Sequence, residues 1–261
     1  MCTPKCSSSV NARVTNMVSG IPMANTPQRA DAAGSIYRLA AVAFGHPLAE
    51  LQQALVDGSF HAAFNEPWHQ VTGREWPRCE PSADFAALEA GYIDAFVHGR
   101  RGKPRISLLA GEYEHLLGGQ TRPVFMLNIQ AFYRHFGLHA ATKDEGRAEE
   151  PDHVIDMLEF MAVLCHLEAR ALERDADPSP YRRAQRDFLQ RYLVPLLNAI
   201  HHDLARQKAL ALDATLIRML EDLPEWTRQQ LAELEARVGP YADASASVSN
   251  RPRSVAQNLW N

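Results

Sequence analysis

Two glutamate–histidine pairs are the residues of this sequence whose spacing could support chemistry. Glu112 precedes His115 by three residues, and Glu150 precedes His153 by the same interval. Such pairs on inward helix faces, joined by two further glutamates, form the di-iron site of carboxylate helical oxidases. Pro151, however, disfavours helical backbone at Glu150, so Glu150 and His153 would not share a helical face. We recognise no matching inward glutamates elsewhere, so a di-iron oxidase is the alternative hypothesis rather than the leading one.

Other catalytic patterns are missing from the sequence. It has no Gly-x-Ser-x-Gly elbow, no Gly-x-Gly-x-x-Gly loop and no Cys-x-x-Cys pair. The basic loop at 99–105 lacks the Gly-Lys-Ser/Thr ending of a phosphate-binding loop. Cys2 and Cys6 would supply two thiolates, which are too few for a closed metal site. We therefore predict no catalytic residue, no bound metal and no cofactor.

Composition limits the kinds of partner. The chain has 261 residues, of which 46% are hydrophobic, so it can bury a sizeable core. Its net charge of −4 argues against a nucleic-acid partner, which usually needs a basic excess. No apolar run approaches the roughly 18 residues of a membrane span, and the first 30 or so residues lack the apolar segment of a secretory signal. We expect a cytoplasmic protein with no membrane span.

Apolar residues recur at spacings of three and four, and no segment alternates with period two. This pattern predicts an all-α fold, a single globular bundle of about nine or ten helices over 33–239. The flanking segments, 1–32 and 240–261, are polar and predicted to be disordered tails. We expect Ser82 to cap a helix, Pro67 to interrupt one, and Pro195 to kink another. The longer helices are expected at 85–97, 124–136, 154–173, 181–207, 210–220 and 224–238.

The acidic stretch Glu149 to His153 is expected to begin the central helix. Pro151 suits a first helical turn because its missing N–H is not needed there. Asp152 would lie where the helix dipole favours a negative charge. The following helix, Val154 to Glu173, has one wide apolar stripe. A polar linker at 140–149 precedes it, so this acidic corner would lie between a linker and a core helix.

A peptide-binding surface is the second candidate. Tyr133 and Arg134 lie near the end of an aromatic helix, and Pro123 and Met126 lie near its start. Tyr113 and Leu116 precede that helix, and the corner Glu150-Pro151-Asp152-His153 follows it. An apolar groove with an acidic rim would suit a basic, partly apolar peptide. Alternatively, the aromatic residues simply fill the core, and spacing alone favours that interpretation.

Three ordered segments resemble the TorD/DmsD/NarJ family of redox-enzyme maturation chaperones. Glu150-Pro151-Asp152-His153, followed by Leu158-Glu159-Phe160-Met161, is similar to the family's signature. Glu112 to Gly119 resembles its Glu-x-Tyr-x-x-Leu-Phe-x-Gly region, with Leu117 where Phe is usual. Phe132 to Gly137 resembles its Tyr-x-x-x-Gly helix end. The resemblance covers about 33–236.

This resemblance implies an all-helical, non-enzymatic cytoplasmic chaperone that is a monomer or homodimer. Its partner would be the catalytic, molybdopterin-binding subunit of a redox enzyme, often bound at a twin-arginine signal peptide. Type II enzymes such as dimethyl sulfide, ethylbenzene or selenate oxidoreductases are the implied clients. By the same resemblance, Asp152 and His153 would line the leader-binding surface, Glu150 would add negative charge, and Tyr133 and Arg134 would lie across the linker.

Overall fold

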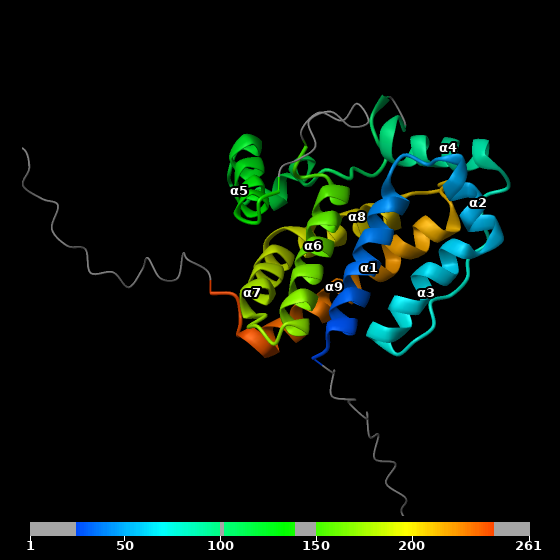
Figure 1. The fold of residues 1–261 in the computed structure, drawn as a ribbon. Helices are drawn as coiled ribbons and strands as arrows, with labels where there is room; N and C mark the ends of the chain where they lie inside the picture. Colours follow the sequence, from blue (N-terminus) through cyan, green and yellow to red (C-terminus); the bar gives the residue numbers. More distant parts are fainter. Residues whose placement is uncertain (1–24, 100–101, 139–149, 243–261) are drawn as a thin grey trace, which may run out of the picture.

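The computed structural model describes residues 25–99, 102–138 and 150–242, and over these ranges the fold is all-α, as predicted (Figure 1). Its one extended pairing is an isolated antiparallel bridge between Leu109 and His153, again within the described ranges. The linker at 140–149, Cys2, Cys6 and most of both predicted tails lie outside these ranges. None of the helices described is long and apolar enough to cross a membrane.

Helices α1 (Pro27–Phe44) and α6 (Val154–Glu173) form the centre of the molecule. They run side by side and make the most extensive helix–helix contact (Figure 1). A Cβ at Gly34 would lie 3.1 Å from Cys165 Cβ, so glycine permits this close approach. Helix α1 begins six residues before the expected start of the domain at 33. Thr26 caps it by accepting the Arg29 N–H, and Pro27 occupies its first turn, a start signal that periodicity alone missed.

Helices α2 (Ala49–Asp57), α3 (Ser59–Thr72) and α4 (Phe85–Tyr92) cover one side of α1, and α4 continues as a π-helical segment, η1 (Ile93–Val97). Two expectations are wrong here. Pro67 lies inside α3 without interrupting it. Asp84, not Ser82, caps α4, because its carboxylate accepts the Ala87 N–H. Ser82 instead donates its N–H and hydroxyl to Asp213.

Helices α7 (Ser179–Phe188) and α8 (Val194–Arg206) are joined by a π-helical segment, η5 (Leu189–Leu193). The π-helical segment ends just before Val194 and Pro195, and the kink expected at Pro195 stays a prediction. Helix α9 (Ala214–Val238) passes through Pro224 as one helix, so the prediction of two separate final helices is wrong. Its N-cap is Asp213, which accepts the Thr215 N–H.

Two short 3-10 turns, η3 (Ala110–Glu112) and η4 (Glu114–Leu116), lead to α5 (Arg122–His135). Helix α5 lies at the edge of the bundle, beside α7 and away from α1 (Figure 1). Its buried side, formed by Phe125, Ile129 and Tyr133, packs on the core. Gly137 follows with a φ of 73°, a left-handed conformation that suits glycine and ends the helix where expected.

Candidate functional site

The acidic corner is a turn ahead of α6 rather than its first turn. His153 is the N-cap of α6, and its Nδ1 atom accepts the Ile155 N–H at 3.2 Å. The helix starts at Val154, as predicted, but Pro151 and Asp152 precede it. Their expected place inside the first helical turn is therefore wrong. The corner is instead fixed by strand-like hydrogen bonds: the Ala110 N–H donates to the Asp152 carbonyl, and the Val154 N–H donates to the Leu108 carbonyl.

The Asp152 side chain is an internal anchor. It is 0% exposed, and its Oδ2 atom accepts the Gly111 N–H at 2.7 Å. The Arg122 guanidinium lies 3.9 Å from the same oxygen. A Cβ at Gly111 would come within 2.7 Å of this carboxylate, so the contact depends on glycine. The Asp152 side chain is therefore buried here and not exposed on a surface, and its predicted contact with a leader peptide stays a prediction.

Tyr133 is also buried, and it holds the other side of the corner. Its hydroxyl donates to the Pro151 carbonyl at 2.8 Å. Burial raises the pKa of Tyr133 well above its usual value, with smaller contributions from the Asp156 and Asp152 carboxylates. Pro151 is buried beside it. Pro151 and Asp152 therefore contact the ends of α5, while the two outer residues of the corner, Glu150 and His153, line a groove on the other side.

That groove, here called the corner groove, has a volume of about 520 Å³. Two of its walls are exposed apolar side chains, Leu48 at 60% and Val97 at 37% exposure. The Nε2 atom of His46, one of its lining residues, is hydrogen-bonded to Glu89 Oε1 at 3.3 Å. Of the residues that the structure describes, no lysine or arginine lines it; the lining residues are His46, Leu48, Tyr92, Phe96, Val97, Pro104, Ser107, Leu108, Leu109, Glu150 and His153. This surface combines apolar walls with one carboxylate, Glu150, and two imidazoles, His46 and His153.

The remaining predicted site residues do not line the corner groove. Tyr113 is half-buried, and its hydroxyl donates to the Ser107 carbonyl; burial and the nearby Asp203 carboxylate raise its pKa. Leu116 and Met126 are half-buried, whereas Pro123 and Arg134 are exposed near the two ends of α5.

Sequence reasoning missed the apolar wall. Leu48 and Val97 are separated from the corner by more than fifty positions along the chain, and no local pattern connects them to it. Leu48 follows Gly-His-Pro and Val97 ends a helix, and neither position indicates that the two side chains line one groove. The groove could therefore not be predicted from residue spacing.

The di-iron alternative finds no support. Glu112 and His115 lie in separate 3-10 turns, not on one helix face, and Glu112 pairs with Arg122 at 2.6 Å. Among the residues that the structure describes, no group of three or more histidine, cysteine, aspartate or glutamate side chains could hold a metal ion. A di-iron site needs two Glu-x-x-His pairs projecting from helices toward a shared centre.

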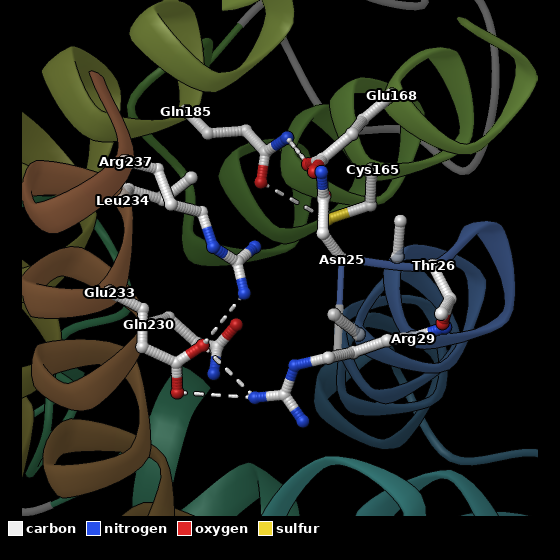
Figure 2. Close-up of a pocket in the computed structure, with 12 residues that line it drawn as sticks. Asn25, Thr26, Arg29, Cys165, Glu168, Gln185, Gln230, Glu233, Leu234 and Arg237 are labelled. Carbon is white, nitrogen blue, oxygen red and sulfur yellow. Dashed lines mark hydrogen bonds and ion pairs between the residues drawn. The ribbon is translucent and has the colours of Figure 1, made fainter. Parts of the chain in front are cut away.

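A buried polar network joins α1, α6, α7 and α9 (Figure 2). Glu168 accepts hydrogen bonds from Arg182 and Gln185, each at 2.7 Å. Arg29 binds both carboxylate oxygens of Glu233, at 3.0 and 3.1 Å. The cavity between them has a volume of about 20 Å³, which is room for about one water molecule. These paired charges hold helices together and leave no space for a substrate.

Comparison with known proteins gives consistent matches. The family model described as nitrate reductase delta subunit matches residues 40–202. The chain is 54% identical to the dimethyl sulfide dehydrogenase assembly chaperone protein of Rhodovulum sulfidophilum, over 89% of this chain and 93% of that one. It is 33% identical to the selenate reductase assembly chaperone protein of Thauera selenatis, over 66% and 83%. It is 28% identical to the perchlorate reductase assembly chaperone protein of Dechloromonas aromatica (strain RCB), over 71% and 84%. No solved structure gives a significant match.

Proposed function

We infer from its membership of the nitrate reductase delta subunit family, the TorD/NarJ chaperones, that this chain is a non-enzymatic assembly chaperone for a molybdoenzyme. The observation that carries the proposal is the 54% identity, over nearly the full length of both chains, to a dimethyl sulfide dehydrogenase assembly chaperone. Its client is then the catalytic subunit of an enzyme like dimethyl sulfide dehydrogenase. The chaperone holds that subunit until the molybdopterin cofactor is inserted.

The corner groove is the proposed binding site for the client's twin-arginine leader. Such a leader combines paired arginines with an apolar segment. Leu48 and Val97 offer exposed apolar surface to that segment. The Glu150 carboxylate lines the same groove and suits a guanidinium, because Arg–carboxylate hydrogen bonds are charge-assisted and can be bidentate. Binding there would cover the leader before export, which requires the chaperone to act in the cytoplasm.

The client is tested by co-expression with a tagged catalytic subunit of dimethyl sulfide dehydrogenase. We expect the full chain to co-purify with the subunit and to raise its molybdenum content. Deleting the leader should weaken co-purification. If the subunit acquires its cofactor equally well without the chain and never co-purifies with it, the chaperone proposal is wrong.

The groove is tested by placing a charge on its apolar wall. Val97→Lys should weaken binding of a synthetic leader peptide about tenfold, because a cation replaces an apolar contact and repels the leader's arginines. Val56→Lys is the matched control, since Val56 is also an exposed valine but does not line the corner groove. If the two variants bind the leader peptide with equal affinity, the corner groove is not the leader-binding site. The proposed client is unaffected by that result.

A further inference from the structure

A second groove lies between α5 and α7. We call it the α5 groove; its volume is about 460 Å³. Its apolar floor includes Phe132 from α5, Phe136 just after the end of α5, and Pro180 and Ala184 from α7. The full set of lining residues is Asn128, Ala131, Phe132, His135, Phe136, Pro180, Ala184, Asp187 and Arg191. It shares no lining residue with the corner groove.

Exposed apolar side chains extend this groove along the outer face of α5. Val124 is 47% and Leu127 56% exposed. Val124, Asn128, Ala131 and His135 are spaced by three and four, so they share one helix face, and Leu127 flanks it. Within the described ranges, the large hydrophobic residues that are exposed are few: Leu48 and Val97 line the corner groove, Val124 and Leu127 lie on α5, and Val42 and Val56 lie elsewhere. Clustered exposed apolar residues of this kind mark interaction surfaces.

The charges around the α5 groove are mostly positive. Helix α5 contains no aspartate or glutamate, and its last turn contains Arg134 and His135. The Arg191 guanidinium lies over the Phe132 ring at 5.6 Å and the Tyr192 ring at 5.0 Å, which places its charge beside the apolar floor. The one carboxylate of the lining, Asp187, is paired with Arg186 at 2.7 Å. The apolar floor therefore has the Arg191 guanidinium beside it, and the carboxylate in its lining is already paired.

We propose that the α5 groove is a second client-binding surface, which takes an amphipathic segment of the client's folded part that carries acidic residues beside its apolar face. The proposal rests on the chaperone function inferred above, because it supposes a client. Electrostatic complementarity favours this occupant. Carboxylates beside an apolar face would pair with Arg134 and Arg191, whereas the arginines of the leader would be repelled by them.

The same charges disfavour two other occupants. The chain's own segment 243–261 contains Arg251 and Arg253 and a single acidic side chain, Asp243. A second copy docking by two-fold symmetry would bring the same cationic patch against itself. Neither complements the groove as an acidic client segment does.

The test uses the full chain and two synthetic peptides of about four helical turns. Both have leucines along one face; the other face carries glutamates in the first peptide and lysines in the second. By fluorescence anisotropy, we expect the glutamate peptide to bind at least tenfold more tightly. Arg191→Glu should weaken it about tenfold, whereas Arg38→Glu, at an exposed arginine of α1, should leave it unchanged. Equal binding of the two peptides, or no effect of Arg191→Glu, overturns the proposal.

The occupant is identified with the tagged catalytic subunit. A photoreactive amino acid at Leu127 should cross-link to a client segment outside the leader that has more acidic than basic residues. A cross-link to the leader, to 243–261 or to a second copy of the chain overturns the proposal. Because the peptide measurement needs no client, it distinguishes failure of this surface from failure of the chaperone function.

Discussion

The corner groove and the α5 groove are alike in size and differ in charge. Both offer exposed leucine or valine side chains. In the part of the chain that the structure describes, the first is lined by Glu150, His153 and His46 without lysine or arginine. The second has Arg191 and the paired Asp187 in its lining, with Arg134 nearby. The hydrophobic effect is non-directional, so apolar surface favours binding of any apolar segment and does not distinguish one segment from another. We therefore propose that the difference in charge selects the bound segment, and that the two grooves do not compete for the same peptide.

The two grooves are connected through the four residues of the corner. Glu150 and His153 face the corner groove, while Pro151 and Asp152 hold the opposite ends of α5. Arg122, at the start of α5, approaches the Asp152 carboxylate, and Tyr133, near its end, donates to the Pro151 carbonyl. The inner residues of this short motif therefore position α5, and the outer residues carry the binding role that we propose for the corner groove.

Removing the Asp152 carboxylate should have the largest effect on stability and on peptide binding at both grooves. Asp152→Ala leaves the Gly111 N–H without its acceptor and Arg122 without a buried partner. We expect the free energy of unfolding to fall by about 3 kcal/mol. Both the leader peptide and the glutamate peptide should bind more than tenfold more weakly, because the corner and α5 lose their common support.

Asp84→Ala is the control, since it removes only a helix cap and should cost about 1 kcal/mol without changing either affinity. Circular dichroism at low temperature verifies that each variant is folded before peptide titration. A folded Asp152→Ala protein with normal affinity for both peptides would separate the two grooves and disprove their shared support.

Charge reversal at the outer corner should affect one groove alone. Glu150→Lys places a cation in the lining of the corner groove. We expect the leader peptide to bind about tenfold more weakly, equivalent to about 1.4 kcal/mol, with the glutamate peptide unchanged. Glu66→Lys, at an exposed position in α3, should change neither affinity. Equal loss of both peptides would mean that the charge difference between the grooves does not select the peptide.

Tyr133→Phe should loosen one end of α5. It removes the hydrogen bond to the Pro151 carbonyl, and we expect a loss of about 1 kcal/mol in the free energy of unfolding. The comparison is Tyr37→Phe, because the buried Tyr37 hydroxyl has no hydrogen-bond partner in the part of the chain that the structure describes. Chemical denaturation should find Tyr37→Phe at least as stable as the parent; a larger loss there than at Tyr133 would contradict the assignment.

These tyrosines also set a pH dependence. Burial raises the pKa of both Tyr37 and Tyr133 in the folded chain. Above about pH 10 the unfolded chain releases these protons while the folded chain keeps them, so the free energy of unfolding falls as pH rises. Each Tyr→Phe variant should reduce that slope. Urea titrations between pH 9 and 11 or so measure it, and an unchanged slope in both variants would contradict the burial effect.

The smallest effects should come from the exposed leucines. Leu48→Ser and Leu127→Ser each remove apolar contact from one groove, and we expect about fivefold weaker binding of the leader peptide and the glutamate peptide respectively. Each variant serves as the control for the other. Because both side chains are largely exposed, melting temperatures should stay nearly unchanged. Weaker binding of the glutamate peptide to Leu48→Ser, or of the leader peptide to Leu127→Ser, would show that the two grooves are not separate sites.

The sequence by itself determined the fold class, the core helix and the position of the corner. Helix α6 begins at Val154 and ends at Glu173, as its apolar stripe predicts, because a buried helix must repeat apolar residues every three to four positions. Prolines were less informative. Pro67 and Pro224 lie inside helices because tertiary packing outweighs their local cost, and Thr26-Pro27 begins a helix that a search for apolar periodicity places later.

Only the tertiary structure decided which residues of the corner face outward. The sequence Glu150-Pro151-Asp152-His153 identifies the turn but does not show which of its side chains are buried. From sequence alone, an aspartate is expected on the surface. Its carboxylate is buried because the Gly111 N–H and Arg122 approach it from segments 41 and 30 positions away in the sequence. Likewise, Leu48 and Val97 become groove walls only when distant helices pack. The spacing of residues reports local helical periodicity. Exposure, charge pairing and grooves depend instead on which distant segments come into contact, and residue spacing does not specify that.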